Sequence, residues 1–143
     1  MDSVVKTLWR KHRVPECDNV QAKIDGFGMC KELVTGIPGG MNDAFASRYL
    51  CRNDAPNTTV VDGGYPSTRT QFVGPFGDEH PLAQAHKEDR VISENYFAYL
   101  KNTWQIVGKV YRRKNVKHSV IIRCAFILTN MLVTHYGGLR KCI

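Results

Sequence analysis

The sequence predicts an α/β domain in which a mixed sheet is flanked by helices. Segments rich in β-branched residues, which are typical of strands, alternate with turn residues between positions 19 and 61. Two long segments with apolar residues at spacings of three and four occupy positions 82–106 and 116–136. The 143 residues, 43% hydrophobic and 23% charged, are enough for one buried core. We therefore expect residues 1–143 to form a single domain.

Residues 1–18 are expected to form a basic segment that is poorly anchored to the domain. Val4 and Val5 have the composition of a strand remnant. The run Arg10-Lys11-His12-Arg13, followed by Pro15, is typical of an exposed basic loop. We expect this loop character to dominate in the segment.

A hairpin and a short helix are expected next. Strand-like segments flank the turn sequence Asp-Gly-Phe-Gly at 25–28, which predicts a hairpin with Asp25 as a turn residue. The residues Gly36 to Gly40 break the chain after this hairpin. Asn42 or Asp43 is suited to cap a following helix, because a short polar side chain accepts a hydrogen bond from its first backbone N–H groups.

A buried strand is predicted at Thr58 to Val61, because all four residues of this segment are β-branched. Asp62 comes directly after it, followed by two glycines, so its carboxylate stands where the backbone leaves the sheet. The stretch from Tyr65 to about Pro81 contains three prolines and is expected to be a long loop.

The second half of the chain predicts two helices. Residues 82–106 form one of them, since apolar residues recur at helical spacing, namely Ile92, Tyr96, Phe97, Leu100 and Trp104. A basic connector, Lys109 to Lys114, precedes the second helix at 116–136, which is strongly apolar and ends at a glycine pair. We expect the second helix to lie mostly in the core and the tail after it to be frayed.

Composition limits the partners. Twenty Lys and Arg against thirteen Asp and Glu give a net charge of +7, which favours a polyanion such as nucleic acid. The five cysteines include no C-x-x-C pair, so we expect reduced thiols in the nucleus or cytoplasm rather than a zinc site. The N-terminus lacks the apolar core of a signal peptide, and Arg123 and Asn130 interrupt the most apolar run. A soluble protein with no membrane partner is expected.

Asp62 and Glu94 are the two carboxylates whose settings suggest chemistry. A helix that crosses a sheet can bring a helical carboxylate to one at a strand end, and such a pair can hold a hard divalent cation. Phosphodiester hydrolysis commonly uses two such ions to activate water and to neutralise the leaving oxygen. Arg90 and Lys101 lie on roughly the same helix face as Glu94, suited to pair with a phosphate or with Glu94 itself. The residues alone leave a turn position for Asp62 and a solvated helix position for Glu94 as open alternatives.

Four blocks of the sequence resemble those of Harbinger-type (PIF-like) transposases. Residues 90–104, RVISENYFAYLKNTW, are similar to the family block R-x-x-V-E-N-x-F-G-x-L-K-x-x-W, with a gap of one residue. Residues 61–66, VDGGYP, resemble its D-[SG]-G-Y-P block, and residues 36–45, GIPGGMNDAF, resemble its G-x-P-G-[SR]-x-[HN]-D-[SA]-F block. Residues 124–130, CAFILTN, are similar to its closing A-C-x-x-L-H-N helix, with threonine in place of histidine. The blocks stand in family order across residues 20–136.

This resemblance implies an RNase H-like fold with a DDE triad of acids. Asp62 then resembles the second acid and Glu94 the third, both holding Mg²⁺ or Mn²⁺ for the cutting and joining of DNA strands. In the family the first acid follows an apolar strand in an A-[LI]-D-G-T-like segment, and Asp2 stands at about that place. Because the strand before Asp2 is missing, the N-terminal strand of the sheet is expected to be incomplete. The resemblance also implies DNA as a partner, a separate DNA-binding protein as a candidate second partner, and the nucleus as the location, with the cytoplasm as the alternative.

Two interpretations of function follow. The first is a divalent-metal-dependent DNA endonuclease domain, a hydrolase with a DDE triad. The second is a catalytically inactive, domesticated transposase remnant that keeps the fold and binds DNA or a protein partner. A third carboxylate beside the other two, from Asp2 or Asp43, distinguishes them. Asp43 is interpreted either as a helix cap or, with Arg90 and Lys101, as a residue that supports the site or contacts phosphate.

Overall fold

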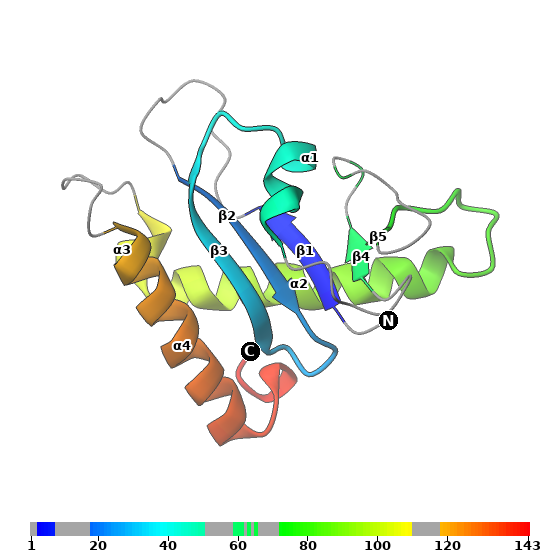
Figure 1. Cartoon of the computed structure of the whole chain (residues 1–143). Coiled ribbons are helices and arrows are strands. Elements are labelled where there is room, and N and C mark those ends of the chain that lie inside the picture. The colour runs from blue at the N-terminus through cyan, green and yellow to red at the C-terminus, as the bar shows by residue number, and fades with distance from the viewer. Residues whose placement is uncertain are drawn as a thin grey trace.

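The computed structural model describes residues 3–7, 18–50, 59–61, 63, 65, 72–109 and 118–143. They form a five-stranded sheet, with the long helix α2 (Ala83–Thr103) across one face and the short helix α1 (Asp43–Ala46) on the other (Figure 1). The predicted α/β architecture is confirmed at this level.

The sheet is mixed, as predicted. Its strand order is β3-β2-β1-β4-β5, in which β1 pairs antiparallel with β2 and parallel with β4. The outer pairs are an antiparallel β2–β3 hairpin and a parallel β4–β5 pair. In chain order the strands are β1 (Ser3–Thr7), β2 (Asp18–Ile24), β3 (Cys30–Pro38), β4 (Thr59–Val61) and β5 (Phe72–Val73).

The position of β1 corrects the expectation that residues 1–18 are poorly anchored. Strand β1 lies in the middle of the sheet, with Val4 opposite both Ile24 of β2 and Val60 of β4. A central strand uses backbone hydrogen bonds on both of its edges, which anchors it more firmly than any terminal remnant. The remaining part of the predicted basic segment, including Arg10 to Arg13, lies outside the described residues.

The β2–β3 hairpin is confirmed, and its strands are longer than predicted. Asp25 Oδ1 accepts hydrogen bonds from the backbone N–H groups of Phe27 (3.0 Å) and Met29 (2.8 Å), so Asp25 is a turn residue. Gly28 has a φ of 81°, a left-handed conformation that glycine adopts without steric cost.

The short helix after the hairpin is also confirmed. Asn42 is its N-cap, since Asn42 Oδ1 accepts a hydrogen bond from the N–H of Ala44 at 2.9 Å. Asp43 is therefore not the cap but the first helical residue, and it is buried. The chain continues from α1 into a 3-10 helix, η1 (Ser47–Tyr49).

The long helix predicted at 82–106 is broken into α2 and a short helix, α3 (Gln105–Gly108). The break falls at Trp104, whose φ of −112° and ψ of 81° are not helical. Its indole Nε1 donates a hydrogen bond to Thr129 Oγ1 at 2.9 Å. This tertiary contact fixes the break against the last long helix, which a helical pattern in the sequence does not reveal.

That last helix, α4 (His118–Tyr136), buries only one face, whereas the sequence predicts a helix mostly in the core. Ile122 and Phe126 are buried, but the opposite face exposes Val120, Ile127 and Met131. By length and composition α4 is the one helix in the described part of the chain that is apolar enough to cross a membrane. Within this domain it contacts β3, α2 and α3.

The tail after α4 is packed rather than frayed. It forms a 3-10 helix, η3 (Leu139–Lys141), in which Leu139 is buried. The N–H of Leu139 donates a hydrogen bond to the carbonyl of Phe27 at 3.2 Å, which joins the tail to the hairpin turn.

Strand β2 contributes to both faces of the sheet, because successive strand residues point to opposite sides. Its apolar residues join the main core between the sheet, α2 and α4, which includes Val20, Ala22, Ile24, Tyr96, Phe97, Leu100, Ile122 and Phe126. Its alternate residues are polar yet buried on the side of α1, namely Asn19, Gln21 and Lys23. A smaller apolar cluster on that side contains Leu50, Val61 and Tyr65.

Candidate functional site

The sheet has one end at which the predicted site elements converge. Because β4 is parallel to β1 and β2 is antiparallel to it, the carboxyl ends of β1 and β4 lie beside the amino end of β2. The turn that leads into α1 is attached to this end, since Asn19 Nδ2 donates to the carbonyl of Met41 at 3.3 Å. The carboxyl end of β4 and the beginning of α1 therefore lie at the same end of the sheet.

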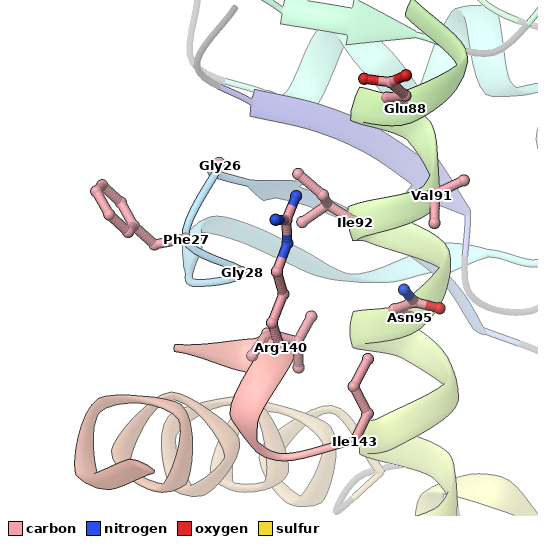
Figure 2. A pocket seen from close by; sticks show the side chains of 10 residues that line it. Gly26, Phe27, Gly28, Glu88, Val91, Ile92, Asn95, Arg140 and Ile143 are labelled. Atoms are coloured by element: carbon pink, nitrogen blue, oxygen red, sulfur yellow. The ribbon is translucent and has the colours of Figure 1, made fainter. Parts of the chain in front are cut away.

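Helix α2 has two flanks beside its buried stripe, and one of them faces the other end of the sheet. Ile92 and Asn95 on this flank line a cavity of about 230 Å³ together with Phe27 of the hairpin turn and Arg140 of the tail (Figure 2). The hairpin turn follows the carboxyl end of β2, which is the end opposite to the carboxyl ends of β1 and β4. This cavity therefore lies at the hairpin end of the sheet, and not at the end where β1 and β4 finish.

The second flank of α2 carries the three predicted site residues of this helix. Successive helical residues are rotated by about 100° around the axis, so Arg90, Glu94 and Lys101 fall within about 40° of one another. The same rotation places Asn95 about 100° and Ile92 about 160° away from Glu94. Arg90, Glu94 and Lys101, hereafter the basic-acidic row, consequently lie on the flank turned toward the carboxyl ends of β1 and β4.

Within this row Arg90 and Glu94 form an ion pair. Arg90 Nη2 lies 3.7 Å from Glu94 Oε1, and the two side chains are 32% and 47% exposed. A pair of this exposure contributes little to stability, because solvent screens the charges. The row therefore presents Glu94 on an accessible helix flank, with its partner Arg90 one turn before it and Lys101 about two turns after it.

Of the three other predicted site residues, the structure describes only Asp43. Asp62 and Asp2 lie outside the described residues. Asp43 is buried at the first position of α1, at the same sheet end as the carboxyl end of β4. Among the residues that the structure describes, no group of three or more His, Cys, Asp or Glu side chains is placed to hold a metal ion.

Strand β1 bears directly on the first acid of the predicted triad. Its sequence is Ser-Val-Val-Lys-Thr, which contains no carboxylate, and Leu8 follows it. Val5 is opposite Val61, the last residue of β4, whereas Ser3 is opposite Thr59. Asp2 precedes the strand, although the resemblance places the first acid after one.

Sequence reasoning missed a chain of buried polar side chains on the α1 side of the sheet. The Tyr65 hydroxyl donates to Gln21 Oε1, and Gln21 Nε2 donates to Asn19 Oδ1 at 2.9 Å. Asn19 in turn donates to Met41, as described above. The strict alternation of polar and apolar residues in Asn-Val-Gln-Ala-Lys-Ile was the available signal, since polar residues facing a covered side of a sheet must find partners.

Sequence reasoning also missed the roles of Thr129 and Asn130 in the closing block. Besides the Trp104–Thr129 bond, Asn130 makes two hydrogen bonds to the backbone of Cys30 and accepts one from the Tyr96 hydroxyl at 3.1 Å. These contacts join α4 to β3, α2 and the start of α3. The block thus has a structural role in this chain.

The Cys30 thiol, which lies at these contacts, is not suited to chemistry at neutral pH. Burial raises the pKa of the Cys30 thiol from 9.0 to about 12, so the side chain stays protonated. Burial likewise raises the pKa of the Tyr96 hydroxyl, which remains a hydrogen-bond donor. In the described part of the chain Cys30, Cys124 and Cys142 are free thiols.

Comparison with known protein families supplies one match. The family model described as DDE superfamily endonuclease matches residues 6–130. The matched range includes all four sequence blocks described above and begins after Asp2. No curated protein and no solved structure matches the chain at a significant level.

Proposed function

The chain belongs to the DDE superfamily endonuclease family, which implies DNA as the substrate, and we propose that it is the nuclease domain of a Harbinger-type transposase with an RNase H-like fold. The observation that carries the proposal is the joint placement of Glu94 and the carboxyl end of β4. The basic-acidic row of α2 is turned toward the sheet end where β4 leads into Asp62. Asp62 follows β4 directly in the sequence and lies outside the described residues, so its place beside Glu94 is part of the proposal.

The donor chemistry of these two residues fits Mg²⁺ or Mn²⁺. Carboxylate oxygens are the ligands that these hard cations prefer, and Asp62 and Glu94 would hold the ion. When bound, such an ion supplies an activated water and stabilises charge on the leaving oxygen. Two protein carboxylates leave the coordination shell dependent on water or phosphate oxygens, so we expect weak binding.

The chain's own side chains have separate tasks at this site. Helix α2 is rigidly packed through Tyr96, Phe97 and Leu100, and this packing holds Glu94 at a fixed height above the sheet. Arg90 keeps the Glu94 carboxylate oriented through its ion pair. Lys101, two turns further along the same flank, adds a positive charge that attracts the phosphate backbone.

A second candidate function, favoured by strand β1, is a remnant that binds DNA without cutting it. The strand next to β4 offers no carboxylate, and the family match begins at Lys6. A nuclease that lacks its first acid keeps the basic surface but loses most of its metal affinity and its catalysis. In either case nuclear residence follows from the substrate, with the cytoplasm as the alternative, and a tagged chain in cells tests it.

The deciding experiment is nicking of supercoiled DNA by the purified chain in Mn²⁺ or Mg²⁺. Asp62→Asn and Glu94→Gln remove the proposed ligands with little change of shape. Glu88→Gln is the matched control, because Glu88 is an exposed glutamate on the opposite flank of the same helix. We expect metal-dependent nicking that both ligand variants lose and the control retains.

Absence of nicking by a folded chain would exclude the endonuclease interpretation. If that chain still binds DNA with an affinity that falls as salt rises, the non-cleaving remnant is supported instead. If Glu88→Gln loses as much nicking activity as Glu94→Gln, the result contradicts a site on only one flank of α2.

A further inference from the structure

Helix α4 carries two apolar stripes on opposite sides. One stripe, which includes Ile122 and Phe126, is buried in the core. On the other side Val120, Ile127 and Met131 are 59%, 60% and 63% exposed. Because successive helical residues are rotated by about 100°, this exposed set fits within about 100° of the helix circumference. Its members, hereafter the outer stripe, are Val120, Cys124, Ile127, Leu128, Met131 and His135.

The domain holds α4 from the side opposite to the outer stripe. Asn130 makes two hydrogen bonds to the backbone of Cys30, and Arg123 Nε donates to Thr35 Oγ1 at 3.0 Å. These contacts fix α4 along β3 at the outside of the domain (Figure 1). The outer stripe therefore has a rigid support, and α4 cannot enter a bilayer without losing these contacts.

The outer stripe is symmetric about a midpoint between Ile127 and Leu128. Reversing its direction exchanges Ile127 with Leu128, Cys124 with Met131, and Val120 with His135. A two-fold interface between identical chains needs this property, because one surface patch meets a second copy of itself. An antiparallel pair of α4 helices therefore brings apolar side chains together in its centre and places His135 only at its two ends.

The exposed area of the outer stripe is sufficient for such a pair. From the exposed fractions of its side chains, the stripe presents on the order of 500 Å² in each copy, so two copies bury about 1,000 Å². This value is at the lower limit for a specific protein interface. Removal of this apolar surface from water favours association, and the size predicts a dimer that dissociates on dilution.

The charges of α4 favour a second copy over a charged partner or a lipid surface. The helix contains no Asp or Glu, and Arg123 is its single Lys or Arg. Helices that lie on lipid surfaces normally have several Lys or Arg on their polar face. In an antiparallel pair the two Arg123 residues are about 14 Å apart along the helix axis, which exceeds the screening length of about 8 Å at physiological salt. A parallel pair would bring them to the same height.

We propose that the outer stripe is an interface for a second copy of this chain, in which two α4 helices pack antiparallel about a two-fold axis between Ile127 and Leu128. The interface uses neither the basic-acidic row of α2 nor the cavity beside the hairpin turn. The inference therefore does not depend on the proposed nuclease function.

Sedimentation equilibrium of the purified, nucleic-acid-free chain tests the proposal over about 1 to 200 µM protein. Salt at about 0.5 M screens the repulsion between the positively charged copies and suppresses association through DNA. Ile127→Glu and, as a second variant, Met131→Glu place a carboxylate in the interface. Ile106→Glu is the matched control, because Ile106 is 55% exposed on α3. Melting temperatures show which variants are folded.

We expect the wild-type chain to show a monomer–dimer equilibrium. Ile127→Glu should raise the dimer dissociation constant at least about 30-fold, because its carboxylate would be buried without a partner at the centre of the interface. Ile106→Glu should leave the constant within about twofold of the wild-type value.

Oxidative cross-linking of Met131→Cys tests the direction of the pair. In the antiparallel pair position 131 of one copy lies opposite Cys124 of the other. Positions 124 and 131 of one helix are about 10 Å apart, which is too far for a disulfide within one chain. We expect peptide mapping to find a disulfide between positions 124 and 131 of two copies, and the wild-type chain to form no Cys124–Cys124 disulfide.

Four outcomes would overturn the proposal. One is a folded wild-type chain that stays monomeric over the whole concentration range. Another is a dimer whose dissociation constant changes in neither Ile127→Glu nor Met131→Glu. A Cys124–Cys124 disulfide would show a parallel pair instead. A monomer that floats with phospholipid vesicles, and loses this binding in Ile127→Glu, would assign the outer stripe to a lipid surface.

Discussion

At the scale of single residues, Asn130 shows how one side chain completes the edge of a sheet. Its Oδ1 accepts from the N–H of Cys30 at 2.9 Å, and its Nδ2 donates to the carbonyl of Cys30 at 2.8 Å. The amide thus takes the place of a peptide group of a neighbouring strand at the edge of β3 that has no strand partner in the described sheet. Asn130 closes the CAFILTN block, so this block is explained by folding rather than by chemistry.

Asn130→Ala is expected to lower the free energy of unfolding by about 2–4 kcal/mol, because it leaves partly buried groups of Cys30 and Tyr96 without this partner. Urea unfolding followed by circular dichroism measures the loss. Asn102→Ala, at an exposed position of α2, should change the same quantity by less than about 0.5 kcal/mol. Equal losses in the two variants would contradict the role of Asn130 at the sheet edge.

At the scale of elements, the two flanks of helix α2 face different parts of the domain. One flank lies beside the hairpin turn and the C-terminal 3-10 helix (Figure 2). The other flank carries Arg90, Glu94 and Lys101. The hairpin turn and the 3-10 helix are in direct contact, since the N–H of Leu139 bonds to Phe27. A Cβ atom at Gly28 would lie 2.3 Å from Leu139 Cβ, so the contact requires glycine.

Gly28→Ala should therefore destabilise the domain by about 2 kcal/mol or more, from the clash with Leu139 and from the left-handed φ. Gly26→Ala is the control in the same turn, because nothing lies within 4 Å of the added methyl group. It should change stability by no more than about 0.5 kcal/mol. Thermal unfolding distinguishes the two, and equal stability of both variants would mean that the turn and the tail do not pack together.

At the scale of the whole molecule, charge and topology act together. The net charge of +7 attracts a polyanion in general. The fold decides which of the positive side chains lie on the same surface as Glu94. Lys101 shares the flank of Glu94, whereas Arg140 lines the cavity on the opposite flank. A variant at either position removes one positive charge and so changes the net charge by the same amount.

Lys101→Gln is expected to weaken DNA binding and to reduce the slope of log affinity against log salt by about 1. Arg140→Gln should leave the slope within about 0.3 of the wild-type value, since it lies away from the proposed DNA path. Fluorescence anisotropy with a labelled duplex at several salt concentrations gives both slopes. The same reduction in both variants would indicate a diffuse charge effect and no defined DNA path.

The sequence by itself determined the elements and the family blocks. The hairpin with Asp25 in its turn, the helix after Asn42 and the two long helices all follow from local patterns of two to four residues. Asp62 and Glu94 stood out for the same reason, because each is placed by its own short segment. Only the tertiary structure decided that β1 is a central strand without a carboxylate, that Trp104 breaks the long helix, and that Tyr65 reaches Gln21. These features join residues that are distant in the chain, and they depend on strand register, helix rotation and buried hydrogen bonds, which no short window of sequence specifies.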